Sequence, residues 1–307
     1  MPTKYKFSGH QTFAFRYGWL EKGVQGMLGD RTLFSREDAL VTLGVGKNMV
    51  ESIRHWCGVT QLIEDDTESK KKGASALRVS AIGRSLLAHD GWDPYLEDDA
   101  SLWLIHWLLV SNPICGTTWQ IAFSFLQRPD FTKRELLDHV AMFAEKNSVD
   151  VNESSLSRDV DCFIRTYTAA RPTASKLNTI EDTFDCPLQE LNLIQASPDG
   201  ELYRFSVGAK PTLPTAVFGY ALGQYFDTAR AGRNTMSVQE CLYGPGSPGQ
   251  AFKLDENALI AHMEELDRIT RGKVELDETA GLKQIYRRHE IDAWKLLESY
   301  YRTGANK

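Results

Sequence analysis

The 307-residue sequence has no long hydrophobic run. Its most apolar stretch, residues 102–110, is nine residues long and includes His106, whereas a membrane-spanning helix needs about 20 apolar residues. The N-terminal residues include Lys4 and Lys6, but no apolar segment follows them, so nothing indicates a secretory signal. We therefore expect a cytoplasmic protein that does not bind membranes.

Cysteine is also scarce. The five cysteines are an odd number, lie at least 24 residues apart and form no C-x-x-C pair, so neither a disulfide framework nor a zinc knuckle is predicted. The sequence also lacks H-E-x-x-H and G-x-G-x-x-G, and its Gly44-Val45-Gly46-Lys47 segment does not have the spacing of a phosphate-binding loop. We predict no metal-ligand set and expect the cysteines to be buried thiols.

Basic residues do not outnumber acidic ones either. Lys and Arg number 35 against 41 Asp and Glu, giving a formal net charge of −6. The molecule as a whole is therefore not a non-specific binder of polyanions, and any nucleic-acid site must be a local basic face. The rest of the composition, 42% hydrophobic and 25% charged, is that of a globular protein with about two or three domains.

Three segments of the chain repeat a pattern that begins helices. Each has an apolar residue, then Ser or Thr, then an acid three positions later, which is the signature of a capping box. The Ser or Thr positions are Ser35, Thr132 and Ser237, so the pattern returns after 97 and 105 residues. After each start, the sequence predicts two helices and a β-hairpin, which is the order of a winged helix.

The second helix of the first unit is predicted from the helical spacing of Val50, Ile53, Trp56 and Cys57. An Asp-Gly turn between apolar runs predicts the hairpin of the second unit. The predicted hairpins pair residues 62–63 with 77–80, 191–195 with 203–207, and 273–276 with 282–286. The predicted second helices of the later units cover 156–167 and 254–269, and connecting helices are expected at 100–110, 118–126 and 214–225.

These patterns together predict a mainly α fold with small β-hairpin wings, in the α+β class, made of tandem winged-helix-like units packed by connecting helices. We expect residues 1–95 to form an N-terminal arm and a winged helix. Residues 96–228 are expected to form a helical connector and a second winged-helix-like unit, and residues 229–307 a degenerate third unit.

The first unit has the residues expected of a DNA-binding winged helix, in which the second helix enters the major groove and the wing contacts phosphate. The predicted contacts are Lys47, Asn48, Arg54 and His55 on the helix, and Lys70, Lys71, Lys72 and Arg78 on the wing. Residues 47–78 contain six basic and five acidic residues, so charge alone does not decide. The alternative is a unit used for protein packing, with the lysines in a solvated loop.

The two later units carry weaker indications. Arg158 and Arg165 are expected on the outer face of the second helix of unit two, where they are candidate DNA contacts. The corresponding helix of the third unit carries several acids, which phosphate would repel, and we interpret it as a partner or packing surface. These acids are Glu256, Glu264, Glu265 and Asp267.

The segment from Phe7 to Leu20 is rich in aromatic residues and also contains His10 and Arg16. At a nucleotide or DNA-end site, His10 could act as acid and base and Arg16 could hold phosphate. These two residues are our catalytic candidates. The alternative is an arm that packs across the winged helix with its polar groups satisfied internally.

The same N-terminal region carries a resemblance to a known family. The combination Ser8-Gly9-His10-x-Thr12-Phe13-x-x-Arg16, with Leu43-Gly44-Val45-Gly46-Lys47 after it, resembles a bacterial family of unknown function that includes SspB-like proteins. The match covers essentially the whole chain, and its first 60 residues are the specific part. Members occur in single-strand DNA phosphorothioation cassettes, beside a cysteine desulfurase, an ATP pyrophosphatase and an ATPase.

The resemblance implies a DNA nickase that supports sulfur incorporation in a phosphorothioation and phage-defence system, acting on double-stranded DNA with Mg²⁺ or Mn²⁺. No nuclease motif of the family can be matched to residues of this sequence. A second hypothesis is therefore a non-catalytic winged-helix regulator or adaptor that docks a sulfur-transfer enzyme on DNA.

Overall fold

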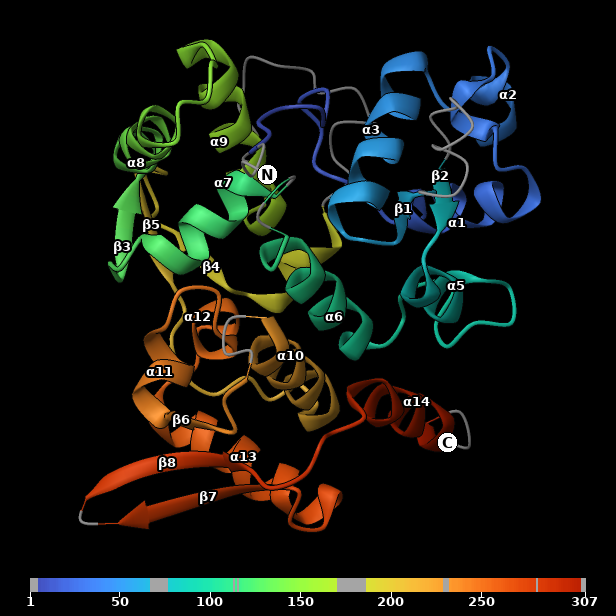
Figure 1. The fold of residues 1–307 in the computed structure, drawn as a ribbon. Helices are drawn as coiled ribbons and strands as arrows, with labels where there is room; N and C mark the ends of the chain where they lie inside the picture. The colour runs from blue at the N-terminus through green and yellow to red at the C-terminus, as the bar shows by residue number, and fades with distance from the viewer. Residues whose placement is uncertain are drawn as a thin grey trace.

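The computed structural model describes residues 5–66, 77–112, 114, 116–169, 186–228, 232–279 and 281–304. Helices dominate, and the strands form small antiparallel sheets: one hairpin and two three-stranded sheets. The predicted α+β class with small β-wings is confirmed. Figure 1 shows the first unit beside the second at the top, with the third below them.

The first unit follows the predicted order of helices and hairpin. Gly44 has a positive φ of 64° at the end of α2, a conformation that glycine adopts without strain, so the chain turns directly into α3. The predicted capping box at Ser35 is wrong, because Ser35 lies in a short 3₁₀ helix and α2 begins only after Asp38. The elements are α1 (Trp19–Gly29), η1 (Leu33–Ser35), α2 (Ala39–Leu43), α3 (Lys47–Val59), β1 (Ile63–Asp65), β2 (Leu77–Val79) and α5 (Ala81–Leu87).

The second unit has one strand that the sequence pattern did not predict. The capping box of Thr132 and Glu135 is confirmed, and the residues just before it form β3, which pairs with β5 to give the sheet order β3-β5-β4. The elements are α6 (Asp99–Val110), α7 (Thr117–Gln120), η2 (Ile121–Phe125), β3 (Asp130–Thr132), α8 (Lys133–Lys146), α9 (Glu153–Tyr167), η4 (Pro187–Leu191), β4 (Ile194–Ala196) and β5 (Leu202–Phe205).

The third unit repeats the topology of the second. Its capping box of Ser237 and Glu240 is confirmed, and its sheet order, β6-β8-β7, again places the strand before the first helix beside the last strand. The second and third units therefore share a sheet order and a helix cap. Helix α10 (Thr215–Thr228) is the connecting helix that precedes this unit. The elements of the unit are β6 (Thr235–Ser237), α11 (Val238–Tyr243), α12 (Pro248–Phe252), α13 (Glu256–Thr270), β7 (Val274–Thr279), β8 (Leu282–Arg287) and α14 (Ala293–Gly304).

The units share one continuous hydrophobic core. Helix α6 lies between them in Figure 1 and is buried along nearly its whole length. Helix α14 packs on α10 and reaches the first unit, where the Tyr301 ring stacks on Trp92 at 5.0 Å. Among the described helices, none has the length and apolarity needed to cross a bilayer. The thiols of Cys57, Cys162 and Cys241 are buried, as expected.

Candidate nucleic-acid interface

The outer face of α3 presents three of the predicted contacts to solvent. Lys47, Asn48 and Arg54 are exposed, while Val50 and Ile53 turn into the core. Within the described part of the chain, none of the three exposed side chains takes part in an ion pair or a side-chain hydrogen bond. Their polar groups are therefore available to a ligand without first breaking an internal contact.

His55 does not lie on that outer face, contrary to the prediction. The ring packs against Gly9, where an added Cβ would lie only 2.6 Å from His55 Nδ1, and its centroid is 5.9 Å from that of His10. Burial, with the nearby His10, lowers the pKa of His55 to about 4. Its buried Nε2 has no hydrogen-bond partner in the described structure. His55 is therefore neutral and faces inward.

The wing of the first unit is described only in part. Arg78 on β2 lies opposite Glu64 on β1, and its Nη2 is 2.7 Å from Glu64 Oε1. Arg78 therefore forms an exposed cross-strand ion pair with Glu64, and a pair of this kind stabilises a protein by about 0–1 kcal/mol. Lys70, Lys71 and Lys72 lie outside the described residues.

Helix α9, the counterpart of α3 in the second unit, carries the other two predicted contacts. Arg158 is exposed, and among the described residues it bonds to its own helix, to Ser154 O and Ser155 Oγ at 3.2 Å each. Arg165 is exposed too, but its Nη2 donates to the backbone oxygen of Thr12. Arg158 is therefore open to solvent, whereas Arg165 ties the N-terminal segment to α9.

The N-terminal segment, residues 5–18, is the arm that the alternative interpretation foresaw, and His10 is its buried centre, with 1% of its surface exposed. His10 Nδ1 accepts the Thr12 N–H at 3.0 Å, so Nε2 carries the proton and donates to Asp159 Oδ1 at 2.8 Å. The two contacts together select one neutral tautomer.

Asp159 on α9 is a site residue that the sequence analysis missed. Its carboxylate is buried and also accepts the Ser8 N–H and the Thr118 hydroxyl, both at 2.6 Å. The signal was available, because Asp159 occupies the apolar stripe of α9 with Leu156 and Phe163 on the same face. A carboxylate in such a stripe has to find buried donors.

The arm also binds α3. Ser52 Oγ donates to His10 O at 2.9 Å, Trp56 Nε1 donates to Phe13 O at 2.9 Å, and the Gln11 amide donates to Glu51 at 2.6 Å. In Figure 1 the arm, drawn in dark blue, runs between α3 and α9. It therefore connects the two helices that the sequence predicts to contact DNA.

Arg16, the second catalytic candidate, is half-buried at the end of the arm. Its guanidinium lies over the Phe13 and Trp19 rings, 5.7 and 5.4 Å from their centroids. No carboxylate in the described residues pairs with it. The rings hold the cation in place by cation–π attraction, and its charge is not neutralised by an acid.

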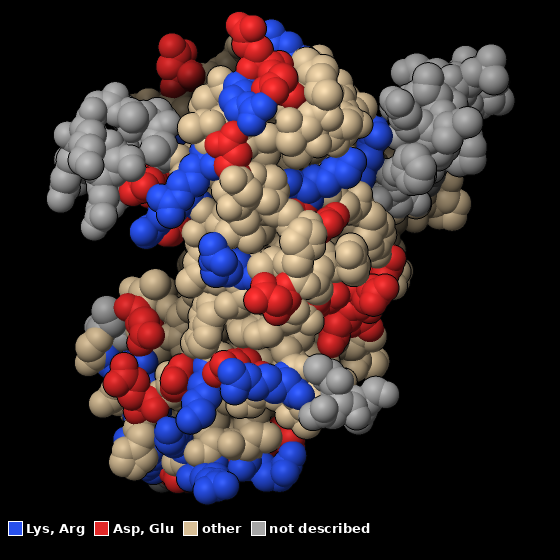
Figure 2. Space-filling view, turned by 90° about the vertical axis from the view of Figure 1, so that its right-hand side faces the viewer, with Lys and Arg blue, Asp and Glu red and all other residues tan. Residues whose placement is uncertain are grey.

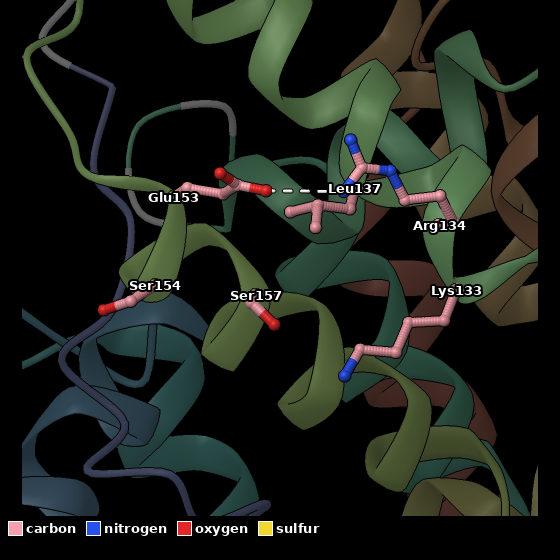
Figure 3. A pocket seen from close by; sticks show the side chains of 6 residues that line it. All are labelled: Lys133, Arg134, Leu137, Glu153, Ser154 and Ser157. Atoms are coloured by element: carbon pink, nitrogen blue, oxygen red, sulfur yellow. Dashed lines mark hydrogen bonds and ion pairs between the residues drawn. The ribbon is translucent and has the colours of Figure 1, made fainter.

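A groove of about 740 Å³ separates α8 and α9. Lys133 pairs with Asp161 at 2.7 Å, and Arg134 pairs with Asp138 at 3.0 Å and with Glu153 at 3.4 Å. The positive charges of both basic residues in the groove are therefore matched by carboxylates. Figure 3 shows the residues that line the groove: Lys133, Arg134, Leu137, Glu153, Ser154 and Ser157.

The third unit is less acidic than its helix sequence suggested. Glu256 pairs with Lys283 at 2.6 Å, and Glu265 pairs with Arg268 at 2.5 Å. Figure 2 shows Lys and Arg side chains gathered over the lower part of the molecule. Two of the four predicted acids are therefore matched by basic partners.

Magnesium in proteins is usually held by one or two carboxylates together with several waters. Both oxygens of Asp159, the buried carboxylate of this interface, already accept hydrogen bonds. Elsewhere in the part of the chain that the structure describes, no three His, Cys, Asp or Glu side chains form a group that could hold a metal.

Comparison with known proteins identifies the class of this chain. Residues 7–301 match the family DUF4007, described as a protein of unknown function, and the chain belongs to that family. A search of curated proteins found no match.

Two solved structures share the whole fold. Both are structures of SspB, one of them with a bound magnesium ion, and they superpose with TM-scores of 0.84 and 0.85 at 31% sequence identity. Each match covers 97% of this chain and 88% of the SspB chain. The resemblance to SspB-like proteins is confirmed.

Proposed function

We propose that this protein is the DNA-binding component of a bacterial DNA phosphorothioation system. Membership of the SspB-like family supports a role in a phosphorothioation system, and the exposed basic residues on the outer faces of α3 and α9 support DNA binding. The observation that carries the proposal is the arm: through His10 and Asp159 it connects two helices that each expose basic residues. A duplex lying along both helices would contact Lys47, Arg54 and Arg158.

The contacts are of the kind that position a protein on DNA. Lys47, Arg54 and Arg158 offer charged donors to phosphate oxygens, and the Asn48 amide can both donate to and accept from a base edge. Because the chain as a whole carries a net negative charge, such binding needs a local basic face. His55 does not belong to the proposed contact surface, because the arm covers it.

His10 acts in this proposal as a positioning residue. Its ring is buried and both of its nitrogens are engaged, whereas an acid or base must reach the proton that it transfers. Arg16 is the better candidate for direct contact with phosphate, because its charge has no acidic partner among the described residues.

The partners implied by the family are the cysteine desulfurase, the ATP pyrophosphatase and the ATPase of the same cassettes. An adaptor that holds one of them on DNA would need a second surface. The third unit, whose α13 lies apart from α3 and α9 in Figure 1, is the part we assign to that contact.

Nicking is a second candidate function, favoured by the magnesium-bound SspB structure. Incubation of the pure protein with supercoiled plasmid, with and without Mg²⁺ or Mn²⁺, tests it. Relaxation that depends on the metal and co-purifies with the protein would support nicking. A mobility shift without relaxation would leave binding as the function.

The binding itself is tested by reversing charges on α3. We expect Lys47→Glu with Arg54→Glu to weaken duplex binding at least about tenfold and to reduce the salt slope of log K by about two, because each lost phosphate contact removes about one. Fluorescence anisotropy of a labelled duplex at several salt concentrations measures both quantities.

The matched control reverses two charges elsewhere. Arg84 on α5 and Lys295 on α14 are exposed, so Arg84→Glu with Lys295→Glu changes the net charge equally. If both double variants lose the same affinity, α3 is not a DNA contact.

A further inference from the structure

A second cavity lies between the second and third units, at residues that the proposed DNA-binding surface does not use. Its volume is about 300 Å³, the lower end of the range for small-molecule sites. Apolar side chains form most of its wall. The lining residues are Leu126, Gln127, Arg128, Pro129, Phe205, Val207, Leu242, Tyr243, Gly249, Gln250, Lys253 and Leu254.

Lys253 is the unusual member of this wall. Only 6% of the residue is exposed. Its ammonium donates to Phe123 O at 2.8 Å and to Gln250 Oε1 at 3.2 Å, and it lies 4.2 Å from the centroid of the Phe205 ring. Lys253, Phe205 and Gln250 all line the cavity.

In the part of the chain that the structure describes, this amine is not paired with an acid. Within the described residues, Lys253 has no carboxylate partner, and burial alone lowers its pKa to about 7. A buried cation without a counter-charge is costly, and an anion that enters the cavity would remove that cost. Arg128, the other basic residue of the wall, is already paired with Glu135 at 2.6 Å.

We propose that this cavity binds a small organic anion with an apolar body of one or two rings, whose carboxylate or sulfonate pairs with Lys253. The apolar wall accepts the rings, and a volume of about 300 Å³ suits a body of that size. A phosphodiester backbone fits poorly, because it offers no apolar group to Leu242, Leu254 or Phe205.

The pairing has a consequence for pH. The anion binds the charged amine, so binding takes up a proton at pH values above the pKa of free Lys253. For a sulfonate, which stays anionic throughout, affinity should fall as the pH rises above about 7. A neutral ligand of the same shape should show no such dependence.

The test is calorimetry on the full chain with 2-naphthalenesulfonate and, as the neutral probe, 2-naphthalenemethanol. We expect the sulfonate to bind at least about tenfold more tightly at about pH 6.5 than at about pH 8.5. Lys253→Met should remove this difference and leave the weaker binding of the alcohol unchanged. Lys295→Met is the control, because Lys295 is exposed on α14 and does not line the cavity.

A second variant and three outcomes decide whether the anion uses this cavity. Val207 is 60% exposed at the cavity, so Val207→Glu should fold normally and weaken sulfonate binding even if Lys253→Met proves unstable. If the sulfonate does not bind, or if its pH dependence persists in Lys253→Met, the proposal is overturned. If Val207→Glu binds as tightly as the wild type, the anion does not use this cavity.

Discussion

Replacing Asp159 by alanine should destabilise the protein more than any other single change at the arm. The carboxylate accepts three hydrogen bonds, from Ser8, His10 and Thr118, and it is almost fully buried. Alanine would remove the acceptor of all three donors, the His10 Nε2–H, the Ser8 N–H and the Thr118 hydroxyl. The arm would then lose its attachment to α9.

The loss of stability depends on whether each donor can find another acceptor. An unsatisfied buried donor costs about 1–3 kcal/mol, and His10 pays that cost in full because its ring cannot reach water. The Thr118 hydroxyl can rotate to a new acceptor, and Ser8 N is partly buried. We therefore expect Asp159→Ala to lower the free energy of unfolding by about 3 kcal/mol. Asp159→Asn, which keeps one acceptor, should cost about 1 kcal/mol.

Urea unfolding followed by tryptophan fluorescence measures these values. Asp161→Ala is the matched control on the same helix: Asp161 forms a half-exposed ion pair with Lys133, and its loss should cost less than about 1 kcal/mol. A cost for Asp159→Ala no larger than that of Asp161→Ala would refute the assignment of Asp159 as the attachment point of the arm.

Three further predictions concern stability. Burial lowers the pKa of His55, His106 and His262 to about 4 each, so the unfolded chain takes up protons at a higher pH than the folded protein. The free energy of unfolding should therefore fall as the pH drops from about 6.5 towards 4, by up to about 3 kcal/mol per histidine. A urea midpoint that stays constant across this pH range would contradict this prediction. Ser237→Ala should cost about 1 kcal/mol in urea unfolding, because it removes a confirmed helix cap, and an unchanged midpoint would show that the cap is unimportant. Arg16→Ala should cost about 1 kcal/mol in the same assay through lost cation–π contact, whereas a loss of several kcal/mol would indicate a buried role.

The features that sequence predicts well here are local ones. The caps at Thr132 and Ser237 and the turn at Asp199-Gly200 depend only on residues a few positions apart, and the structure contains all of them. The three-residue strands β3 and β6 were missed, because each is defined by pairing with a strand about 50 or 70 residues later. The cap at Ser35 failed because a 3₁₀ helix intervenes.

In the candidate site, too, features set by nearby residues were predicted and features set by distant residues were not. Lys47, Asn48 and Arg54 were placed correctly on the outer face of α3, because helical periodicity alone determines which side of a helix a residue occupies. His55 follows the same periodicity, yet it faces the arm. The arm packs there because His10 binds Asp159, a residue 149 positions further along the chain. Only the folded structure brings these residues together.

Hydrogen exchange of the protein with and without duplex DNA tests the central claim most directly. The account predicts slower exchange in peptides covering the exposed faces of α3 and α9, with little change in β7 and β8. Protection confined to the third unit, or absent from both helices at saturating DNA, would contradict the claim that these two helices form the DNA-binding surface.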